Sequence, residues 1–199
     1  MEISWIDIVC SLAGLSCVIL AGRGSKYNFW VGYVYTVLLF VMFWQRNVYA
    51  SLLLQPVSLG INILGHYRWT HPHSDEESSS RSGELRVSAL TIWQRCLTVA
   101  FVLLTALVWG RLLNALGGRI APDPVPYLDA LVTVLILTAQ YLSAQKKLEC
   151  WVLWLVVNVT QLILHIRIGN VFMPVVCALY LVNGIVSMIN WLKMYKKKA

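Results

Sequence analysis

The chain has 199 residues, of which 58% are hydrophobic and only 13% are charged, and its mean hydropathy is +0.67. This excludes a soluble domain, because such domains average about 45–50% apolar and about 25% charged residues and could not bury so much apolar surface at this length. The formal net charge of +7 predicts no nucleic-acid partner, since the basic residues lie between apolar runs and at the C-terminus. The composition therefore predicts an all-α integral membrane protein.

Seven apolar segments are long enough to cross a lipid bilayer as helices, which requires about 20 residues each. The first begins with Glu2 and Asp7 instead of the basic residues of a signal peptide, and we interpret it as a retained span. We therefore expect seven transmembrane helices. They cover residues 3–21, 28–45, 49–67, 93–115, 127–145, 150–167 and 171–192.

The seven segments form two triplets with one additional span between them. The loops inside the triplets are short, whereas the two connections to the middle span are long and rich in Ser, Gly or Pro. We expect the first of these connections to be a solvated linker. The predicted units are a first three-helix repeat (1–69), a cytoplasmic linker (70–92), a connecting transmembrane helix (93–116), an external loop (117–126), a second three-helix repeat (127–192) and a basic cytoplasmic tail (193–199).

The distribution of basic residues predicts the orientation of the spans. If the Lys-rich C-terminus is cytoplasmic, only Arg46, Arg111, Arg119 and Arg167 of the sixteen Lys and Arg residues lie outside, and the other twelve lie inside. This distribution obeys the positive-inside rule. We therefore expect a multi-pass protein of the bacterial inner membrane with its N-terminus outside and its C-terminus in the cytoplasm.

The two triplets resemble each other at a shift of about 122–124 residues. The single span between them gives both triplets the same orientation, so the pattern predicts a parallel repeat with its axis along the membrane normal. Chance similarity between apolar segments is the alternative. The paired features are Asn47-Val48-Tyr49 with Asn170-Val171-Phe172, Trp69 with Trp191, and Asp7 with Asp129.

The sixth segment carries its polar and aromatic residues on one helical face. Trp151, Trp154, Asn158, Gln161 and His165 follow one another at steps of 3, 4, 3 and 4 residues. Flat aromatic rings next to amide and imidazole groups can stack on a planar ring and hydrogen-bond to its edge. The alternatives are polar contacts between helices and, for Trp151, an anchor at the membrane interface.

Polar residues in the other segments extend this pattern, because such groups usually face the interior of a helix bundle or a cavity. Together they predict a polar, aromatic-lined chamber for a neutral or weakly charged ring compound. These residues are Trp30, Tyr33, Tyr35 and Thr36 in the second segment, Ser51, Gln55, Ser58 and Asn62 in the third, Asp129, Thr133 and Gln140 in the fifth, and Tyr180 in the seventh.

Catalytic and nucleotide-binding motifs are absent from the sequence, including HExxH, GxSxG and the phosphate-binding loop. The five cysteines contain no CxxC pair, and the four histidines lack zinc-site spacing. We therefore expect no enzyme, no metal and no cofactor. The span interiors contain no relay of acidic residues, which favours facilitated diffusion over proton coupling. A lipid-modifying enzyme and a structural protein whose polar stripes only join helices are the competing hypotheses.

Four segments resemble the PnuC family of bacterial vitamin transporters, whose best-known members carry nicotinamide riboside. They are SWIDIVCSLAGLSCVILAG at 4–22, NVYASLLLQ at 47–55, INILGHYRW at 61–69 and, most specifically, KKLECWVLWLVVNV at 146–159. The resemblance covers nearly the whole chain. It implies a three-plus-one-plus-three bundle similar to SWEET transporters, facilitated transport, trapping of the substrate by a cytoplasmic kinase, and a homotrimer.

The resemblance also implies that Trp154 and Asn158 hold the substrate, with Gln140 and Gln55 in the same chamber. Riboside-type members have an Asn three residues after a Gly of the second span, but here Gly32 is followed by Tyr35 at that place. Relatives that carry thiamine also lack this Asn. We therefore expect nicotinamide riboside as the substrate, with thiamine or another nucleoside-like vitamin as alternatives. The candidate substrate-binding residues are Trp154, Asn158, Gln140, Gln55, Tyr35, Trp30, Trp151, Gln161, His165 and Tyr180.

Overall fold

A computed structural model of the chain describes residues 5–45, 49–72, 85–117, 126–167 and 172–196. In these ranges the regular secondary structure is helical, and one isolated parallel bridge joins Ser88 to Lys147. Each helix coincides with one predicted segment, so the all-α prediction and the seven helices are confirmed. The helices are α1 (Trp5–Gly22), α2 (Tyr27–Gln45), α3 (Tyr49–Thr70), α4 (Ile92–Gly117), α5 (Pro126–Ala144), α6 (Cys150–Arg167) and α7 (Phe172–Lys196).

Five of the helices, α1, α2, α4, α5 and α7, are long and apolar enough to cross a membrane. In α6 only the stretch Cys150–Ile163 is strongly apolar, and α3 contains Pro56 together with several polar residues. Large apolar side chains are exposed on all seven helices, for example Leu104 on α4 and Val182 on α7. Such a surface suits lipid contact, because hydrocarbon is as apolar as these side chains. The chain is therefore a multi-pass membrane protein.

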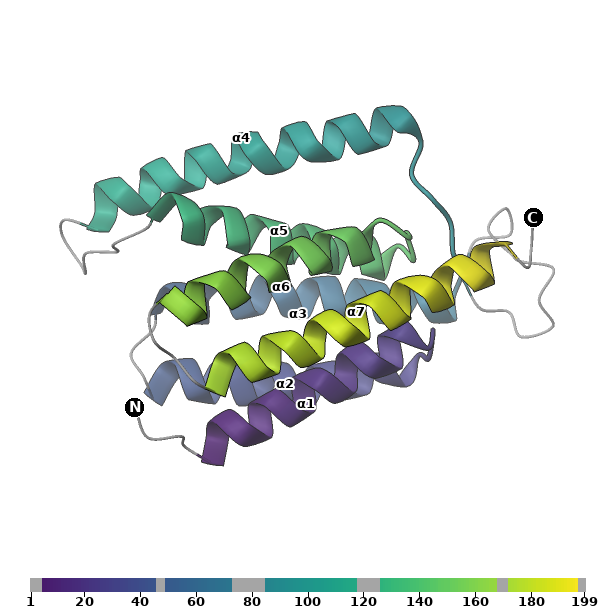
Figure 1. Cartoon of the computed structure of the whole chain (residues 1–199), viewed down its shortest axis with the longest axis horizontal. Coiled ribbons are helices and arrows are strands. Elements are labelled where there is room, and N and C mark those ends of the chain that lie inside the picture. The colour runs from purple at the N-terminus through teal and green to yellow at the C-terminus, as the bar shows by residue number, and fades with distance from the viewer. Residues whose placement is uncertain (1–4, 46–48, 73–84, 118–125, 168–171, 197–199) are drawn as a thin grey trace.

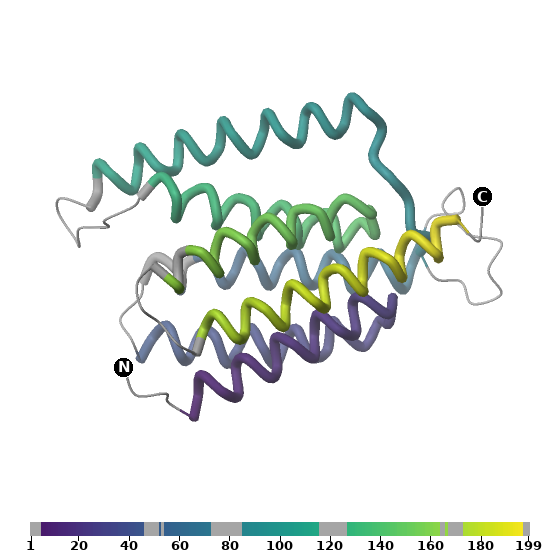
Figure 2. The backbone as a smooth tube through the Cα atoms, in the orientation of Figure 1, coloured from purple at the N-terminus to yellow at the C-terminus, as the bar shows by residue number. Residues whose placement is uncertain are grey.

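The helices are arranged as a ring of six with the seventh outside it (Figures 1 and 2). Along the ring, α1 packs on α2, α2 on α3, α3 on α5, α5 on α6, α6 on α7, and α7 returns to α1. Helix α4 packs mainly on α5, shares an apolar core with α5 and α6, and lies along the edge of the bundle. The ring is made of α1, α2, α3, α5, α6 and α7, and α4 lies outside it.

The turn from α1 to α2 and the turn from α5 to α6 have the same backbone hydrogen bonds. The amides of Gly24 and Ser25 donate to the carbonyls of Ala21 and Leu20, and the amides of Lys146 and Lys147 donate to those of Ser143 and Leu142. Both are Schellman turns, which end a helix with a residue of positive φ. Gly24 has φ 72° and Lys146 has φ 54°. The second turn therefore places a lysine where glycine is usual.

An aromatic cluster, defined here as Phe29, Trp69, Trp151 and Trp191, fills the end of the ring next to these two turns. All four side chains are at least 96% buried. The Trp151 ring lies edge-on to Trp191 at 5.5 Å between centroids, Trp191 lies 6.0 Å from Trp69, and Trp69 lies edge-on to Phe29 at 5.0 Å. Because aromatic side chains bury large areas, this cluster is the main apolar core of the bundle.

The last part of the predicted linker is packed and not solvated, so that expectation, made for residues 70–88, is wrong for residues 85–88. Leu85 and Val87 are buried in the apolar core beside the aromatic cluster. The amide of Ser88 donates to the carbonyl of Lys146, and the amide of Leu90 donates to the Glu149 carboxylate. The apolar residues at alternate positions could have indicated this segment. The earlier, Ser-rich part of the linker lies outside the described residues.

A capping box starts α4 directly after this packed segment. The Gln94 amide donates to Thr91 Oγ1 at 3.4 Å, and the Thr91 amide donates to Gln94 Oε1 at 3.0 Å. These reciprocal bonds satisfy backbone donors that the first helical turn leaves free. Arg95, one residue later, forms an ion pair with Glu149 at 2.9 Å. The start of α4 is therefore fastened to the start of α6.

Candidate functional site

The predicted face of α6 is divided between the core and the interior of the ring. Trp151, at the start of the face, is only 1% exposed and belongs to the aromatic cluster. Trp154 is half-buried and packs against both this cluster and the smaller apolar core shared by α4, α5 and α6. Gln161, two turns further on, is half-buried. His165 lies in α6, but its side chain is outside the described part of the structure.

Asn158 is the polar residue of this face that is most enclosed, with only 8% of its surface exposed. It makes no hydrogen bond to any other residue within the described ranges. An amide side chain can donate two hydrogen bonds and accept two more, so a buried one carries considerable unused capacity. Asn158 is suited to bind a polar ligand, because no other described residue uses its donors and acceptors.

Gln140 on α5 is joined to α3 by a side-chain hydrogen bond. The Ser58 hydroxyl donates to Gln140 Oε1 at 2.8 Å. Gln55 lies one turn before Ser58 on α3, is half-buried and has an interaction of its own. The three residues were all expected in the chamber, and the structure brings Ser58 and Gln140 into direct contact at the α3–α5 interface. This bond occupies the Oε1 atom of Gln140, whereas its Nε2 atom carries two further donors.

Tyr35 on α2 and Tyr180 on α7 form a second pair, because their two phenol groups meet over α1. The pair lies against Gly14 of α1, and a Cβ atom added there would collide with the Tyr180 hydroxyl and come within 3.0 Å of the Tyr35 ring. Glycine at this position therefore allows three helices to meet at one phenol pair. The sequence predicted both tyrosines but not the glycine that makes room for them.

Trp30 lies away from these groups, on the exposed side of α2. It is 59% exposed, and its ring lies edge-on to Tyr33 and to His66 of α3. The Tyr33 hydroxyl and His66 Nδ1 are 2.9 Å apart and share a hydrogen bond. His66 was considered only as a metal ligand in the sequence, and here it joins α2 to α3. The helical spacing of Asn62 and His66 could have indicated this contact.

Asn62 is a further residue that the candidate list lacks. Its side chain faces Gly32 of α2, where an added Cβ would lie 2.6 Å from Asn62 Nδ2, and that nitrogen lies 3.4 Å from the carbonyl oxygen of Phe29. The close approach of α2 to α3 therefore depends on Gly32. The structure assembles polar groups in pairs across the α2–α3 and α3–α5 interfaces, whereas Tyr35 and Tyr180 meet over Gly14 of α1.

Neutral polar and aromatic side chains enclosed by membrane helices are typical of carriers for small polar compounds. The chain matches the family described as nicotinamide mononucleotide transporter over residues 4–193. It is 30% identical over 178 residues to the nicotinamide riboside transporter PnuC of Escherichia coli. The alignment covers 82% of this chain and 74% of the relative. The chain therefore belongs to this transporter family, and its predicted membership of the PnuC group is confirmed.

Less similar relatives include one with the same name and one with a different name. The nicotinamide riboside transporter PnuC of Neisseria mucosa is 27% identical over 98% of this chain and 75% of its own length. The riboflavin/roseoflavin transporter RibM of Streptomyces davaonensis is 25% identical over 96% of this chain and 85% of its own. A crystal structure of the vitamin B3 transporter PnuC superposes with a TM-score of 0.76 at 25% identity, covering 98% of this chain and 84% of that one.

Proposed function

We propose that the chain carries nicotinamide riboside across the bacterial inner membrane by facilitated diffusion, and that phosphorylation inside the cell traps the substrate. The observation that carries the proposal is the α6 face, where the enclosed amide of Asn158 follows the half-buried Trp154 by one helical turn. The names of the relatives from Escherichia coli and Neisseria mucosa support the same substrate.

The charge of the candidate residues favours the riboside over the mononucleotide. A phosphate group is usually bound by Arg or Lys, which donate charge-assisted hydrogen bonds to its oxygens. The ten candidate residues include neither Arg nor Lys, and the side chains that the structure describes are neutral amides, phenols and indoles. The pyridinium ring of nicotinamide riboside is a cation, which aromatic faces attract. Neutral aromatic surroundings therefore suit the unphosphorylated substrate.

We assign a role to each group of candidate residues. Trp154 stacks on the pyridinium ring, and Asn158 hydrogen-bonds to the carboxamide or the ribose. Gln140 and Gln55 supply further amide contacts from α5 and α3, and the phenol pair of Tyr35 and Tyr180 supplies hydroxyl contacts. Gln161 and His165 extend the polar face of α6, Trp151 supports Trp154 from the aromatic cluster, and Trp30 contacts substrate near the end of the pathway.

A three-plus-one-plus-three, SWEET-like repeat is part of this proposal. It is supported by bonds that recur at a shift of 122 residues: Trp69 Nε1 donates to the Ser143 carbonyl at 3.2 Å, and Trp191 Nε1 donates to the Ala21 carbonyl at 3.1 Å. The two Schellman turns recur at the same shift. The α3–α5 and α7–α1 interfaces exchange places under this relation. Substrate sites in such folds lie between the repeats.

The proposed orientation puts the N-terminus outside and the aromatic cluster at the cytoplasmic end. The C-terminal lysines and the basic turns Arg23–Lys26 and Lys146–Lys147 lie at that end of the chain's spans, which the positive-inside rule favours. All seven helices span the membrane in this arrangement, α3 and α6 with their polar faces turned away from lipid. The homotrimer is an expectation from the family resemblance, which the mass of the purified protein in detergent would test.

Calorimetric titration of the purified protein tests the substrate. Nicotinamide riboside, nicotinamide mononucleotide, thiamine and riboflavin are titrated in parallel. We expect the riboside to bind and the mononucleotide to bind at least tenfold more weakly, about 1.4 kcal/mol, because its phosphate finds no cation. Binding of thiamine or riboflavin alone would contradict the proposal that nicotinamide riboside is the substrate. The site would then be assigned to the vitamin that binds. No binding of any of the four would contradict the substrate class.

The variant Asn158→Leu tests whether the α6 face is a site or a helix contact. A binding role predicts loss of about 1–3 kcal/mol of affinity with no loss of thermal stability, since the replaced amide has no partner among the described residues. A purely structural role predicts lower stability and unchanged affinity.

Uptake into proteoliposomes tests the transport mode. Facilitated diffusion is saturable and persists when an uncoupler is added, whereas proton coupling predicts that uptake collapses.

A further inference from the structure

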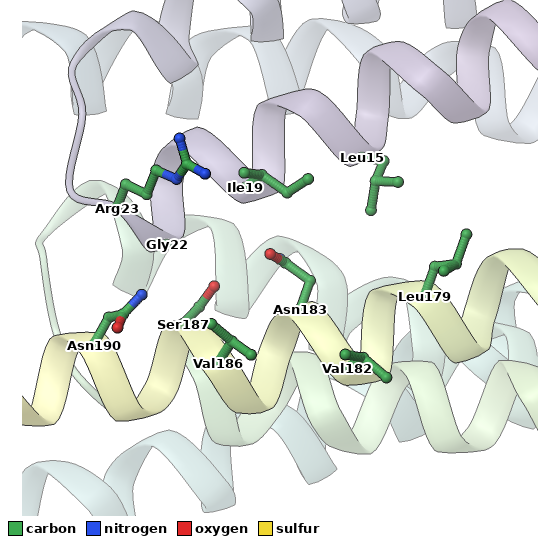
Figure 3. Close-up of a pocket in the computed structure, with 10 residues that line it drawn as sticks. All are labelled: Leu15, Ile19, Gly22, Arg23, Leu179, Val182, Asn183, Val186, Ser187 and Asn190. Carbon is green, nitrogen blue, oxygen red and sulfur yellow. The ribbon is translucent and has the colours of Figure 1, made fainter.

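A groove of about 300 Å³ lies between α1 and α7, on the side of the ring away from the proposed substrate site. Its outer wall is formed by Leu179, Val182 and Val186 of α7, which are 49%, 62% and 50% exposed. Figure 3 shows Arg23 where α1 ends, and Asn183 and Ser187 on α7 pointing toward α1. Since α1 and α7 are both long and apolar enough to span a membrane, the groove opens to lipid.

The floor of the groove is polar, which is unusual on a lipid-facing surface. Ser187 is 1% exposed and lies directly against Gly22 of α1. Asn183 lies one turn, about 6 Å, further from the α1–α2 turn, and its Nδ2 atom is buried with no hydrogen-bond partner among the described residues. Asn190 lines the end of the groove next to Arg23. Arg23 is exposed and makes no ion pair within the described ranges.

The equivalent interface between α3 and α5 provides an internal control. At the shift of 122 residues that relates the two turns, Asn183 corresponds to Ile61, Ser187 to Gly65 and Arg23 to Gln145. At the end of the groove the polarity is kept with the two residue types exchanged, since Asn190 corresponds to Arg68 and Arg23 to Gln145. Two helices can therefore pack in this geometry without the inner amide of Asn183 and the hydroxyl of Ser187. The polar floor between α1 and α7 is not needed for helix packing, which indicates a ligand.

We propose that this groove binds an anionic phospholipid from the leaflet that faces the α1–α2 turn. Arg23 and Asn190 bind the headgroup phosphate, because a guanidinium donates charge-assisted hydrogen bonds to phosphate oxygens. The Asn183 Nδ2 atom donates to an ester carbonyl of the same lipid, and an acyl chain lies along Leu179 and Val182. A second copy of this chain would have to bring an anionic group into an otherwise apolar interface, whereas a phospholipid carries both chemistries in one molecule.

Native mass spectrometry of the purified protein, mixed with phosphatidylglycerol or phosphatidylcholine of the same acyl chains, tests the proposal. We expect the wild-type protein to retain phosphatidylglycerol preferentially. Arg23→Gln should reduce this preference about fivefold, and Asn183→Leu should reduce retention of both lipids. Lys26→Gln is the matched control, because it removes the same charge from the same turn at an exposed residue outside the groove. It should leave the preference unchanged.

Several results would overturn the proposal. They are equal retention of the two lipids by the wild-type protein, equal effects of Arg23→Gln and Lys26→Gln, and displacement of the bound lipid by inorganic phosphate alone. Oligomer masses that disappear with Arg23→Gln would assign the groove to a second copy of the chain instead. Thermal unfolding in detergent verifies that each variant is folded. If Arg23→Gln does not fold, Asn183→Leu decides: lower retention supports the proposal, and unchanged retention overturns it.

Discussion

The aromatic cluster and the polar middle of the ring differ in how their side chains are packed and hydrogen-bonded. Trp69 and Trp191 each donate an indole hydrogen bond to a backbone carbonyl of the opposite triplet and pack against each other, while the Nε1 atom of Trp151 is buried with no partner among the described residues. In the middle, Asn158 has no partner among the described residues, and Trp154 is only half-buried. Complete packing favours stability, whereas unused hydrogen-bond capacity favours binding. The aromatic cluster is therefore suited to stabilise the fold, and the polar middle is suited to bind a ligand.

Within the polar middle, some side chains contact a polar group of another helix and others do not. Ser58 and Gln140 are hydrogen-bonded across the α3–α5 interface, and Tyr35 and Tyr180 lie together over Gly14. A ligand could reach Ser58 and Gln140 only by replacing or extending a bond that already exists, whereas Asn158 can bind without breaking one. We therefore expect the largest effect of mutation in the aromatic cluster and the smallest at the Ser58–Gln140 hydrogen bond.

Trp191→Ala should have the largest effect, a loss of about 3–5 kcal/mol of stability, because the side chain is fully buried and the cavity left behind cannot close. Thermal unfolding in detergent measures it. Trp44→Ala, at a position 62% exposed on α2, is the control and should cost little. Equal unfolding temperatures for the two variants would remove the distinction between the aromatic cluster and the rest of the bundle.

Gly14→Ala should cost about 1–3 kcal/mol of stability, because the added methyl group collides with the Tyr180 hydroxyl. Tyr180→Phe removes that hydroxyl and should restore part of the loss in the double variant. Thermal unfolding of the two single variants and the double variant measures this rescue. Additive effects would show that the Tyr35–Tyr180 pair does not depend on Gly14.

Trp154→Ala should weaken substrate binding by about 1–3 kcal/mol, the usual contribution of a ring stacked on an aromatic side chain. It should destabilise the protein less than Trp191→Ala, because Trp154 is half-buried. Calorimetry with nicotinamide riboside measures the affinity. Val152→Ala, 46% exposed on the same helix, is the control. An unchanged affinity in folded Trp154→Ala protein would remove this residue from the site.

The Ser58–Gln140 hydrogen bond should contribute least, about 0.6 kcal/mol, which is the average for hydrogen bonds between membrane helices. A double-mutant cycle of Ser58→Ala and Gln140→Leu, followed by thermal unfolding and by substrate affinity, measures the coupling. A coupling confined to stability would make the pair a helix contact. A coupling that also affects affinity would place Gln140 at the substrate.

The helices were predictable because bilayer thickness and hydrophobicity fix the length and composition of a spanning segment. The polar and aromatic face of α6 was predictable from helical spacing. Which of its residues are buried in the core and which face the interior of the ring was not. The same 3–4 spacing that places Trp151 and Trp154 on one face leaves open which of them the neighbouring helices bury. The structure encloses Trp151 in the aromatic cluster because Trp191 and Trp69 arrive there from α7 and α3. The packed segment at Leu85 and Val87 was missed because Ser-rich neighbours dominate its composition.

The sequence by itself determined the class of protein, the seven helices and the residues that belong to the polar faces, since these follow from local composition and periodicity. Only the tertiary structure decided which polar groups are paired, that Gly14 admits the tyrosine pair, and that a polar groove lies between α1 and α7. The physical reason is that pairing depends on contacts between residues far apart in the chain, whereas helix formation is governed by near neighbours and by the surrounding lipid.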